Sequence, residues 1–454
     1  MKKRYSVLWL LLVSFLLSGC FSTNISERLI TETTPETTEA PVTEKPPVSH
    51  IPAVKITDIV TTVSTDETDF ETAATEESRE EKSSLTTEAP PEEAFVTDSS
   101  RFTDRLYEIK EDYGIYGMSV ALFKDGEIVH TESVGLADVK EEIPCTDNTR
   151  YRIASLSKLV STMMIMKLCD EGKLSTDTVL SEATGLEYDY KYSDEKVKLW
   201  HVLTHTAGLI DTGIYEDGAN FQYSISRIFS GAHNGYDPGE VFNYSNFGSG
   251  SMGAIIECIT GEYFCDYAEK SFFTPLGMDA AYVIDYIDDK DSCANVYDYD
   301  GEIFKIGTWK RNREYYEGFG LGNSYYSAQC ELIITASDMA KLGIALCGDG
   351  TYKEQRILSK ESVEAMNSKW FSTEKYGMGL NVRIYDDVIE NRVIYGHPGN
   401  ALGCITGLFY DPSDQTGVVV LTNRCMPIVD NGTGFYTPVR EIIEEAYTCY
   451  LGGI

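Results

Sequence analysis

The sequence predicts an α+β fold in which both ends of the ordered region build one β-sheet, flanked by helices, with a mostly helical segment inserted between them. Near the start, residues 118–123 and 127–132 are strand-like, and the turn Lys124-Asp125-Gly126 joins them into a β-hairpin. Near the end, strand patterns return at residues 379–384, 393–396, 404–410 and 416–422. Between them, residues 173–330 hold helical pieces, many aromatic residues and turns. A sheet that needs both ends of the chain forms one interleaved unit rather than two independent domains.

The first twenty residues predict export from the cytoplasm. Lys2, Lys3 and Arg4 precede an apolar run over residues 7–17, which is too short for a comfortable membrane span. The ending Leu17-Ser18-Gly19-Cys20 resembles a bacterial lipoprotein cleavage box. By that resemblance, residues 1–20 are a lipoprotein signal peptide, Cys20 carries the lipid, and the protein is extracytoplasmic and anchored to the bacterial cell membrane. The alternative is an ordinary export signal with an incidental cysteine.

Residues 21–99 predict a disordered, acidic linker. Thr, Glu, Pro, Ser and Ala dominate this segment, and it holds too few large apolar groups to offset the entropy of ordering the chain. As a coil its ends lie on the order of 50 Å apart. Such a segment suits a tether that holds the domain predicted over residues 100–454 away from a membrane.

The formal net charge of the whole chain is -34. A phosphate backbone binds basic surfaces, so this charge argues against nucleic acid as a partner. It also argues against a body that binds anionic lipid headgroups.

Ordered structure is expected from about residue 100. Phe102, Leu106, Ile109 and Tyr113 follow helical spacing, and Gly114 ends the run. A second, buried helix is predicted from the apolar run over residues 159–168, and a closing helix over about 438–450.

The buried helix begins with the two residues that matter most chemically. Ser155 and Lys158 are three apart, so on a helix their side chains lie on one face within reach of each other. An amine held beside a serine hydroxyl in an apolar setting can act as its base. Alone the motif is weak, because Ser155 could be a helix N-cap and the same spacing recurs at Ser193 to Lys196 and at Ser372 to Lys375. Ser157 points elsewhere and is the weaker candidate.

Two later motifs carry further candidate groups. Tyr244-Ser245-Asn246 follows a turn, and there a phenol could share a proton with an amine while the amide orients a carbonyl. His397-Pro398-Gly399 lies among residues that resemble an edge strand, where a glycine lets a ligand come close.

Other chemistries are not favoured. His201 and His205 are four apart, but without a third ligand a pair of helix-end histidines is the better interpretation than a metal site. Neither a metal nor a cofactor is expected, and no nucleotide-binding loop is present. Without Cys20, ten cysteines remain that could pair, although Cys169, Cys258 and Cys347 lie in apolar helical runs.

The order Ser155-x-x-Lys158, Tyr244-x-Asn246, His397-x-Gly399 resembles the serine hydrolases of the class C β-lactamase and D-alanyl-D-alanine carboxypeptidase family. The blocks at residues 117–120, 152–155, 203–209, 238–239, 275–278, 335–338 and 420–423 also match in family order. The resemblance covers about 101–450. It implies the β-lactamase/transpeptidase-like fold, with the site in the cleft between the sheet and the helical domain.

The resemblance also implies roles. Ser155 is the acylated nucleophile, Lys158 its proton partner, and Tyr244 a general base. Asn246, His397 and Gly399 then belong to the substrate site, and the backbone N–H groups of Ser155 and Asn400 form the oxyanion hole. Whether Lys158 or Tyr244 takes the proton stays open.

The third motif departs from the lactamase pattern, in which Lys and Thr usually occupy the positions of His397 and Pro398. A histidine is largely neutral near pH 7, and proline offers neither a hydroxyl nor an N–H. If His397 binds a substrate carboxylate, it does so in its protonated form. Because members of that family with His at this position include peptidases and esterases, the resemblance implies a hydrolase of D-amino-acid peptides of the cell wall, or of related amides and esters. The alternatives are a β-lactamase or esterase of the same fold, and a catalytically silent lipoprotein that binds wall peptides.

Overall fold

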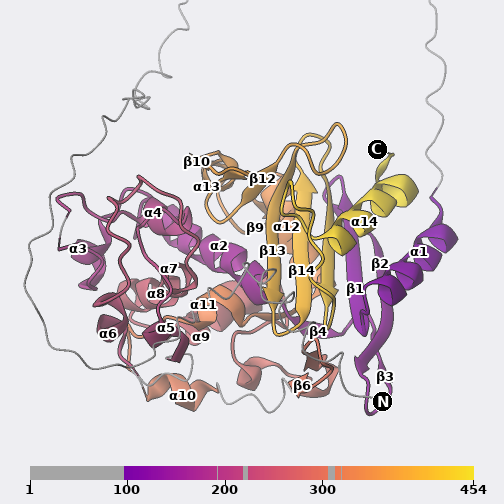
Figure 1. The fold of residues 1–454 in the computed structure, drawn as a ribbon, viewed down its shortest axis with the longest axis horizontal. Coiled ribbons are helices and arrows are strands. Elements are labelled where there is room, and N and C mark those ends of the chain that lie inside the picture. Colours follow the sequence, from indigo (N-terminus) through magenta and orange to yellow (C-terminus); the bar gives the residue numbers. More distant parts are fainter. Residues whose placement is uncertain (1–96, 192, 218–222, 305–311, 319, 454) are drawn as a thin grey trace, which may run out of the picture. The chain divides into compact units, whose positions relative to one another are not determined.

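The computed structural model describes residues 97–191, 193–217, 223–304, 312–318 and 320–453 (Figure 1). The predicted signal peptide, the lipid-bearing Cys20 and the linker up to residue 96 lie outside the described residues and stay predictions. Helix α1 (Ser99–Asp112) begins within one residue of the start expected for the folded domain, and the Asp98 side chain caps it by accepting from the Arg101 backbone N–H.

The described residues form a nine-stranded sheet in the order β10-β11-β12-β13-β14-β15-β1-β2-β3. The predicted hairpin is β1 (Gly117–Lys124) and β2 (Glu127–Asp138), and β3 (Ile143–Pro144) follows at the edge. From the other end of the chain come β10 (Phe371–Ser372), β11 (Gly377–Met378), β12 (Arg383–Tyr385), β13 (Ile394–Ala401), β14 (Cys404–Asp411) and β15 (Thr416–Thr422). Strand β1 pairs antiparallel with β15, with Met118 opposite Thr422. The predicted sheet built from both ends is confirmed.

One predicted strand, over residues 379–384, is wrong. The chain turns there between β11 and β12, and Asn381 adopts a left-handed φ of 52°. The backbone N–H of Asn381 donates to the Leu203 carbonyl at 2.7 Å and its side chain donates to the Thr162 hydroxyl at 2.8 Å. These contacts draw the turn toward the helical region, which a strand pattern cannot reveal. As a result Arg383 opens β12, opposite Gly396 of β13.

Helices cover both faces of the sheet (Figure 1). Alternate residues of β1 divide between two cores, as strand geometry requires. Val120 and Leu122 pack with α1 and α14 (Thr437–Ala446), whereas Ala121 and Phe123 pack with α12 (Ala336–Cys347) and α2 (Ser157–Asp170). The two ends of the domain meet, because the Asp98 N–H donates to the Cys449 carbonyl at 3.2 Å.

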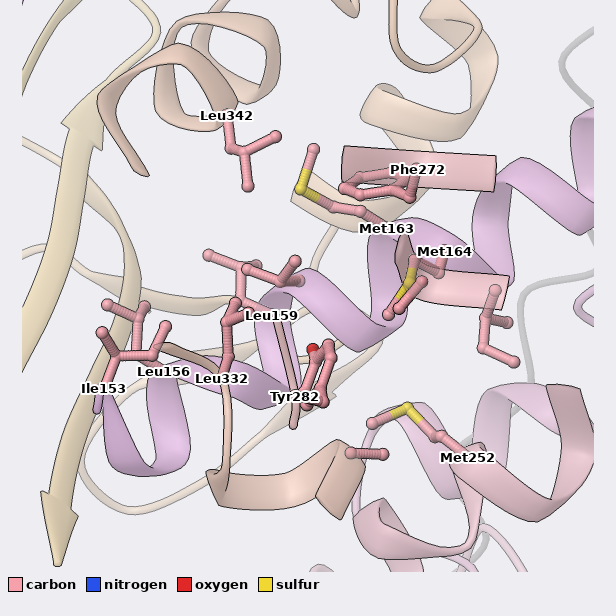
Figure 2. Close-up of a cluster of buried hydrophobic side chains, with 14 of the residues drawn as sticks. Ile153, Leu156, Leu159, Met163, Met164, Met252, Phe272, Tyr282, Leu332 and Leu342 are labelled. Atoms are coloured by element: carbon pink, nitrogen blue, oxygen red, sulfur yellow. The ribbon is translucent and has the colours of Figure 1, made fainter. Parts of the chain in front are cut away.

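Helix α2 is the centre of the larger core (Figure 2). Leu159, Met163 and Met164 on this helix pack among Met252, Phe272, Tyr282 and Leu342, which come from the helical region and from α12. Its residues 157–166 are all buried, so this part of the helix is enclosed on every side. It therefore holds its first turn rigidly beside the sheet.

The helical region consists of short elements. They are α3 (Leu180–Thr184), α4 (Leu199–Leu203), α5 (Gly213–Asp217), α6 (Ile225–Phe229), α7 (Asn246–Gly250), α8 (Met252–Thr260), α9 (Phe264–Ala268), α10 (Arg313–Glu317) and α11 (Ser327–Cys330). The remaining α-helix is α13 (Lys360–Asn367). The remaining strands form the short pairs β4 (Arg150–Arg152) with β7 (Ile333–Thr335), β5 (Val296–Tyr297) with β6 (Ile303–Phe304), and β8 (Thr351–Tyr352) with β9 (Gln355–Arg356). Within the described ranges, no helix combines the length and apolar character needed to cross a membrane.

Candidate active site

Ser155 lies on a tight turn between β4 and α2. The 3-10 turn η2 (Ala154–Leu156) carries it, so Ser155 stands just before the α-helix and not within it, in contrast to the helical position that the sequence predicts. Ala154 takes a left-handed φ of 50°, a conformation that non-glycine residues rarely adopt and that is often found at functional sites. The Ser155 side chain is held at the surface of a rigid core with 5% of the residue exposed.

Lys158 is fully buried, and its amine contacts the serine. The Nζ atom donates to Ser155 Oγ at 3.0 Å and to Asn246 Oδ1 at 3.0 Å. The backbone carbonyl and the side-chain oxygen of Gln329 both lie 3.1 Å from Nζ and share its remaining N–H group. A buried amine needs such partners, because desolvation of a charge is costly when it is not compensated by hydrogen bonds.

Tyr244, in the loop before α7, and Asn246, the first residue of that helix, lie beside the same amine. Lys158 Nζ lies 5.1 Å from the centroid of the Tyr244 ring, which stacks on the His205 ring at 4.3 Å. The ring nitrogen Nδ1 of His205 accepts from the Ser245 N–H at 3.2 Å. The structure therefore brings Ser155, Lys158, Tyr244 and Asn246 together from two segments far apart in the sequence.

Strand β13 passes directly beside the serine turn. A Cβ at Gly399 would lie 2.3 Å from the Ile153 carbonyl oxygen and 2.2 Å from Thr406 Oγ1, so only glycine fits there. The Asn400 side chain is held by Tyr299, whose hydroxyl donates to it, and by Tyr436, whose hydroxyl accepts from it, each at 3.1 Å. The backbone of β13 is thus fixed next to the Ser155 turn, and the oxyanion hole of Ser155 and Asn400 stays a prediction.

His397 is fully buried, with its Nδ1 2.6 Å from the Pro398 carbonyl oxygen. Because a carbonyl only accepts, Nδ1 carries the proton and donates. Burial holds the pKa of His397 well below its usual range, and the nearby charges of Arg383 and Lys158 lower it further. The protonated role that the sequence suggests for His397 is therefore not supported, since the ring is neutral at physiological pH.

A cation does lie beside the site, on the strand next to β13. The Arg383 guanidinium stands over the Tyr376 ring at 4.7 Å and over the Tyr244 ring at 5.6 Å. Its Nη1 donates to the Tyr385 hydroxyl at 3.4 Å, and its Nε is buried with no hydrogen-bond partner. Among the residues that the structure describes, none offers it a carboxylate at ion-pair distance.

Several groups of the site are not among the residues that the sequence predicts for it. Gln329 carries no sequence signal, and Arg383 falls within the strand that is wrongly predicted. Asp211, which binds the Tyr244 loop, lies two residues after the block at 203–209, and that proximity is a signal that could have found it. The spacing of His205 points only to a metal ligand or a helix end.

The rival serines are placed differently. Ser157 accepts from the Leu332 N–H at 3.1 Å, and Ser372 and Lys375 are exposed. Lys196 is exposed and pairs with Asp189 at 2.6 Å.

The ten described cysteines are all free thiols.

Comparison with known proteins places the chain among relatives. A family model described as Beta-lactamase matches residues 101–436. Protein flp of Staphylococcus aureus (strain N315) is 28% identical over 189 residues, which are 40% of this chain but only 38% of that protein, so the match spans well under half of that relative. Penicillin-binding protein 4 of Amycolatopsis lactamdurans is 22% identical over 361 residues, which are 77% of this chain and 90% of that protein.

Solved structures share the fold. The octameric penicillin-binding protein homologue from Pyrococcus abyssi has a TM-score of 0.60 at 22% identity and covers 77% of each chain. EstCE1, a hydrolase with promiscuous acyltransferase activity, also has a TM-score of 0.60, at 21% identity, over 76% of this chain and 98% of that chain. These likenesses confirm the predicted fold class.

Proposed function

The chain belongs to the beta-lactamase family, and on that premise we propose that this serine hydrolase forms its acyl-enzyme on Ser155 and cleaves D-amino-acid peptides of the cell wall, or related amides and esters. The observation that carries the proposal is the 3.0 Å contact between the buried Lys158 amine and the Ser155 hydroxyl. A serine is a weak nucleophile until a neighbouring base removes its proton, and this amine is in place to do so.

The proposed chemistry proceeds in two steps. Ser155 Oγ attacks the substrate carbonyl carbon while its proton passes to Lys158 or Tyr244, and the leaving group departs with a proton from the same groups. Water then hydrolyses the ester on Ser155. The N–H groups of Ser155 and Asn400 would bind the developing oxyanion, and each such donor is worth about 3–4 kcal/mol of barrier.

The charges around the site favour a substrate that carries a carboxylate. His397 is neutral and Pro398 has no donor, so neither supplies the cation and hydroxyl of the lactamase pattern. Arg383 offers a cation that lacks a carboxylate partner among the described residues and stands over Tyr244. A peptide with a free C-terminal carboxylate would complete that pairing, because a guanidinium binds carboxylates strongly.

Three other functions can be weighed against this proposal. EstCE1, which shares the fold, is a hydrolase with promiscuous acyltransferase activity. An esterase is the second candidate here, and its neutral substrates would not need Arg383. A silent binder of wall peptides is disfavoured, because a binding protein has no need of an amine held against a buried serine hydroxyl. Efficient β-lactam hydrolysis is the least favoured activity, on account of His397 and Pro398.

We also propose that the protein is lipid-anchored through Cys20 and works outside the cytoplasm. The support for this is the sequence itself: the basic start, the short apolar run and the box that ends at Cys20.

Labelling with a fluorophosphonate and with a fluorescent penicillin tests the proposal, followed by peptide mapping of the adduct. We expect the fluorophosphonate adduct on Ser155 and none in a Ser155→Ala variant. An adduct on Ser157, Ser193 or Ser372 would refute the assignment. Hydrolysis of a peptide ending in two D-amino acids, compared with a neutral ester, then separates peptidase from esterase.

A further inference from the structure

The Asp211 carboxylate binds the segment that directly follows Tyr244, and the proposed function gives it no role. Its Oδ1 accepts from the Ser245 hydroxyl at 3.0 Å and from the Phe247 N–H at 2.8 Å. Its Oδ2 accepts from the Asn246 N–H at 3.1 Å and from Asn246 Nδ2 at 2.9 Å. One half-buried carboxylate thus binds three consecutive residues that directly follow Tyr244.

These contacts fix the orientation of the Asn246 amide. A carboxylate only accepts hydrogen bonds, so the NH2 group of Asn246 must face Asp211. The amide oxygen then has to face the other way, and there it accepts from Lys158 Nζ at 3.0 Å. The Asp211 carboxylate, the Asn246 amide and the Lys158 amine therefore form one chain of hydrogen bonds that ends at Ser155.

We propose that Asp211 is a positioning residue for the reaction of Ser155: its carboxylate orients the Asn246 amide, holds the Tyr244 turn, and through that amide sets the position and proton affinity of the Lys158 amine. This inference rests on the proposed function, in which a neutral Lys158 or its partner Tyr244 takes the serine proton. A negative charge on the far side of one amide favours the ammonium form of the lysine. Removing the charge should let the ammonium lose its proton at lower pH.

Other titratable groups also surround the amine. The rings of His205 and His397 face it, and the charge of Lys158 helps to lower the pKa of both, after burial. Tyr244 lies against it, and Arg383 stands behind that ring. The two histidine rings are neutral, because burial lowers the pKa of each, and the charge of Arg383 favours the uncharged amine. The chain of hydrogen bonds from Lys158 through the Asn246 amide ends at the Asp211 carboxylate.

The test is the rate of fluorophosphonate labelling as a function of pH in the full chain and in Asp211→Asn. The probe is uncharged, so it does not depend on Arg383. In the parent the rate should rise with pH as the amine becomes neutral. In Asp211→Asn the plateau should fall roughly 10- to 100-fold, because the amide loses its fixed orientation. The acid limb of the profile of labelling rate against pH should move to lower pH by roughly half a unit to one unit.

Asp170→Asn is the matched control. Asp170 ends α2 and accepts from the Ser359 N–H and from the hydroxyls of Ser359 and Ser362, so it also joins two segments, but far from the amine. We expect it to lower stability without moving the acid limb. If the limb of Asp211→Asn coincides with that of the parent, Asp211 is merely structural and the inference is wrong.

A second variant covers the case in which Asp211→Asn does not fold. Asp211→Glu keeps the charge and displaces it, so the rate should fall while the acid limb stays in place. A shifted limb in that variant would contradict the inference. Absence of labelling in the parent would instead overturn the proposed function, and the inference with it, so the two failures can be told apart.

Discussion

Replacing Arg383 by glutamine should separate acidic from neutral substrates. In the proposed complex the guanidinium binds the substrate carboxylate, an interaction between charged hydrogen-bonding groups that is worth about 1.5–3 kcal/mol. At about 1.4 kcal/mol per factor of ten, its loss lowers kcat/KM for the acidic substrate roughly 10- to 100-fold. The ceiling is about 4 kcal/mol, the Coulomb energy of two unit charges 4 Å apart near a protein surface.

The assay compares one peptide that has a free C-terminal carboxylate with its carboxamide. Arg383→Gln should reduce kcat/KM for the acid and leave the carboxamide nearly unchanged. Arg313→Gln is the matched control, since Arg313 also stands over a tyrosine ring, at 4.5 Å, but is paired with Asp266. Because His397 is neutral, the preference of the parent for the acid should be flat between pH 6 and about 8. An equal loss on both substrates would show that Arg383 is structural.

Three further outcomes are expected. Lys158→Ala should slow fluorophosphonate labelling of Ser155 by roughly 10²- to 10⁴-fold, the usual worth of a general base, and labelling at the parent rate would remove Lys158 from the mechanism. Burial raises the pKa of Glu257 to about 7, although four backbone N–H groups bind its carboxylate. The folded protein then binds the extra proton, so stability should fall by about 2–3 kcal/mol from pH 5 to 8, and urea unfolding of Glu257→Gln should lack that slope. Parallel curves would contradict the burial argument. Cys20→Ala should abolish metabolic labelling by a fatty-acid probe, and an equally labelled variant would refute the anchor.

The sequence predicted the parts of the fold that periodicity encodes. The hairpin of β1 and β2, the buried helix α2, and strands β14 and β15 have strong local patterns, and each lies where it was expected. The strand expected over residues 379–384 failed because long-range contacts of Asn381 override its local pattern. No local pattern could contain those contacts, since the partners are more than a hundred residues away.

The candidate site shows the same division. Ser155, Lys158, Tyr244 and Asn246 belong to motifs with fixed spacing, so the amino-acid sequence alone identifies them, although their roles stay predictions. Asp211 and Gln329 contact residues of those motifs, but neither belongs to a motif with a fixed spacing. The charge state of His397 depends on complete burial, which depends in turn on how β12 packs beside β13.

The pairing of β1 with β15 has a consequence for the order in which the protein can fold. Met118 finds its partner only when residue 422 has been synthesised, so the middle of the sheet is assembled last. Until then the edge of β1 that pairs with β15 has no partner, and α14 does not yet complete the cover of Val120 and Leu122. Such nonlocal pairing is slow and prone to aggregation. A nascent chain that stops before β15 therefore cannot complete the sheet. Its early strands must be kept from pairing with other chains until the C-terminal strands and α14 have been synthesised.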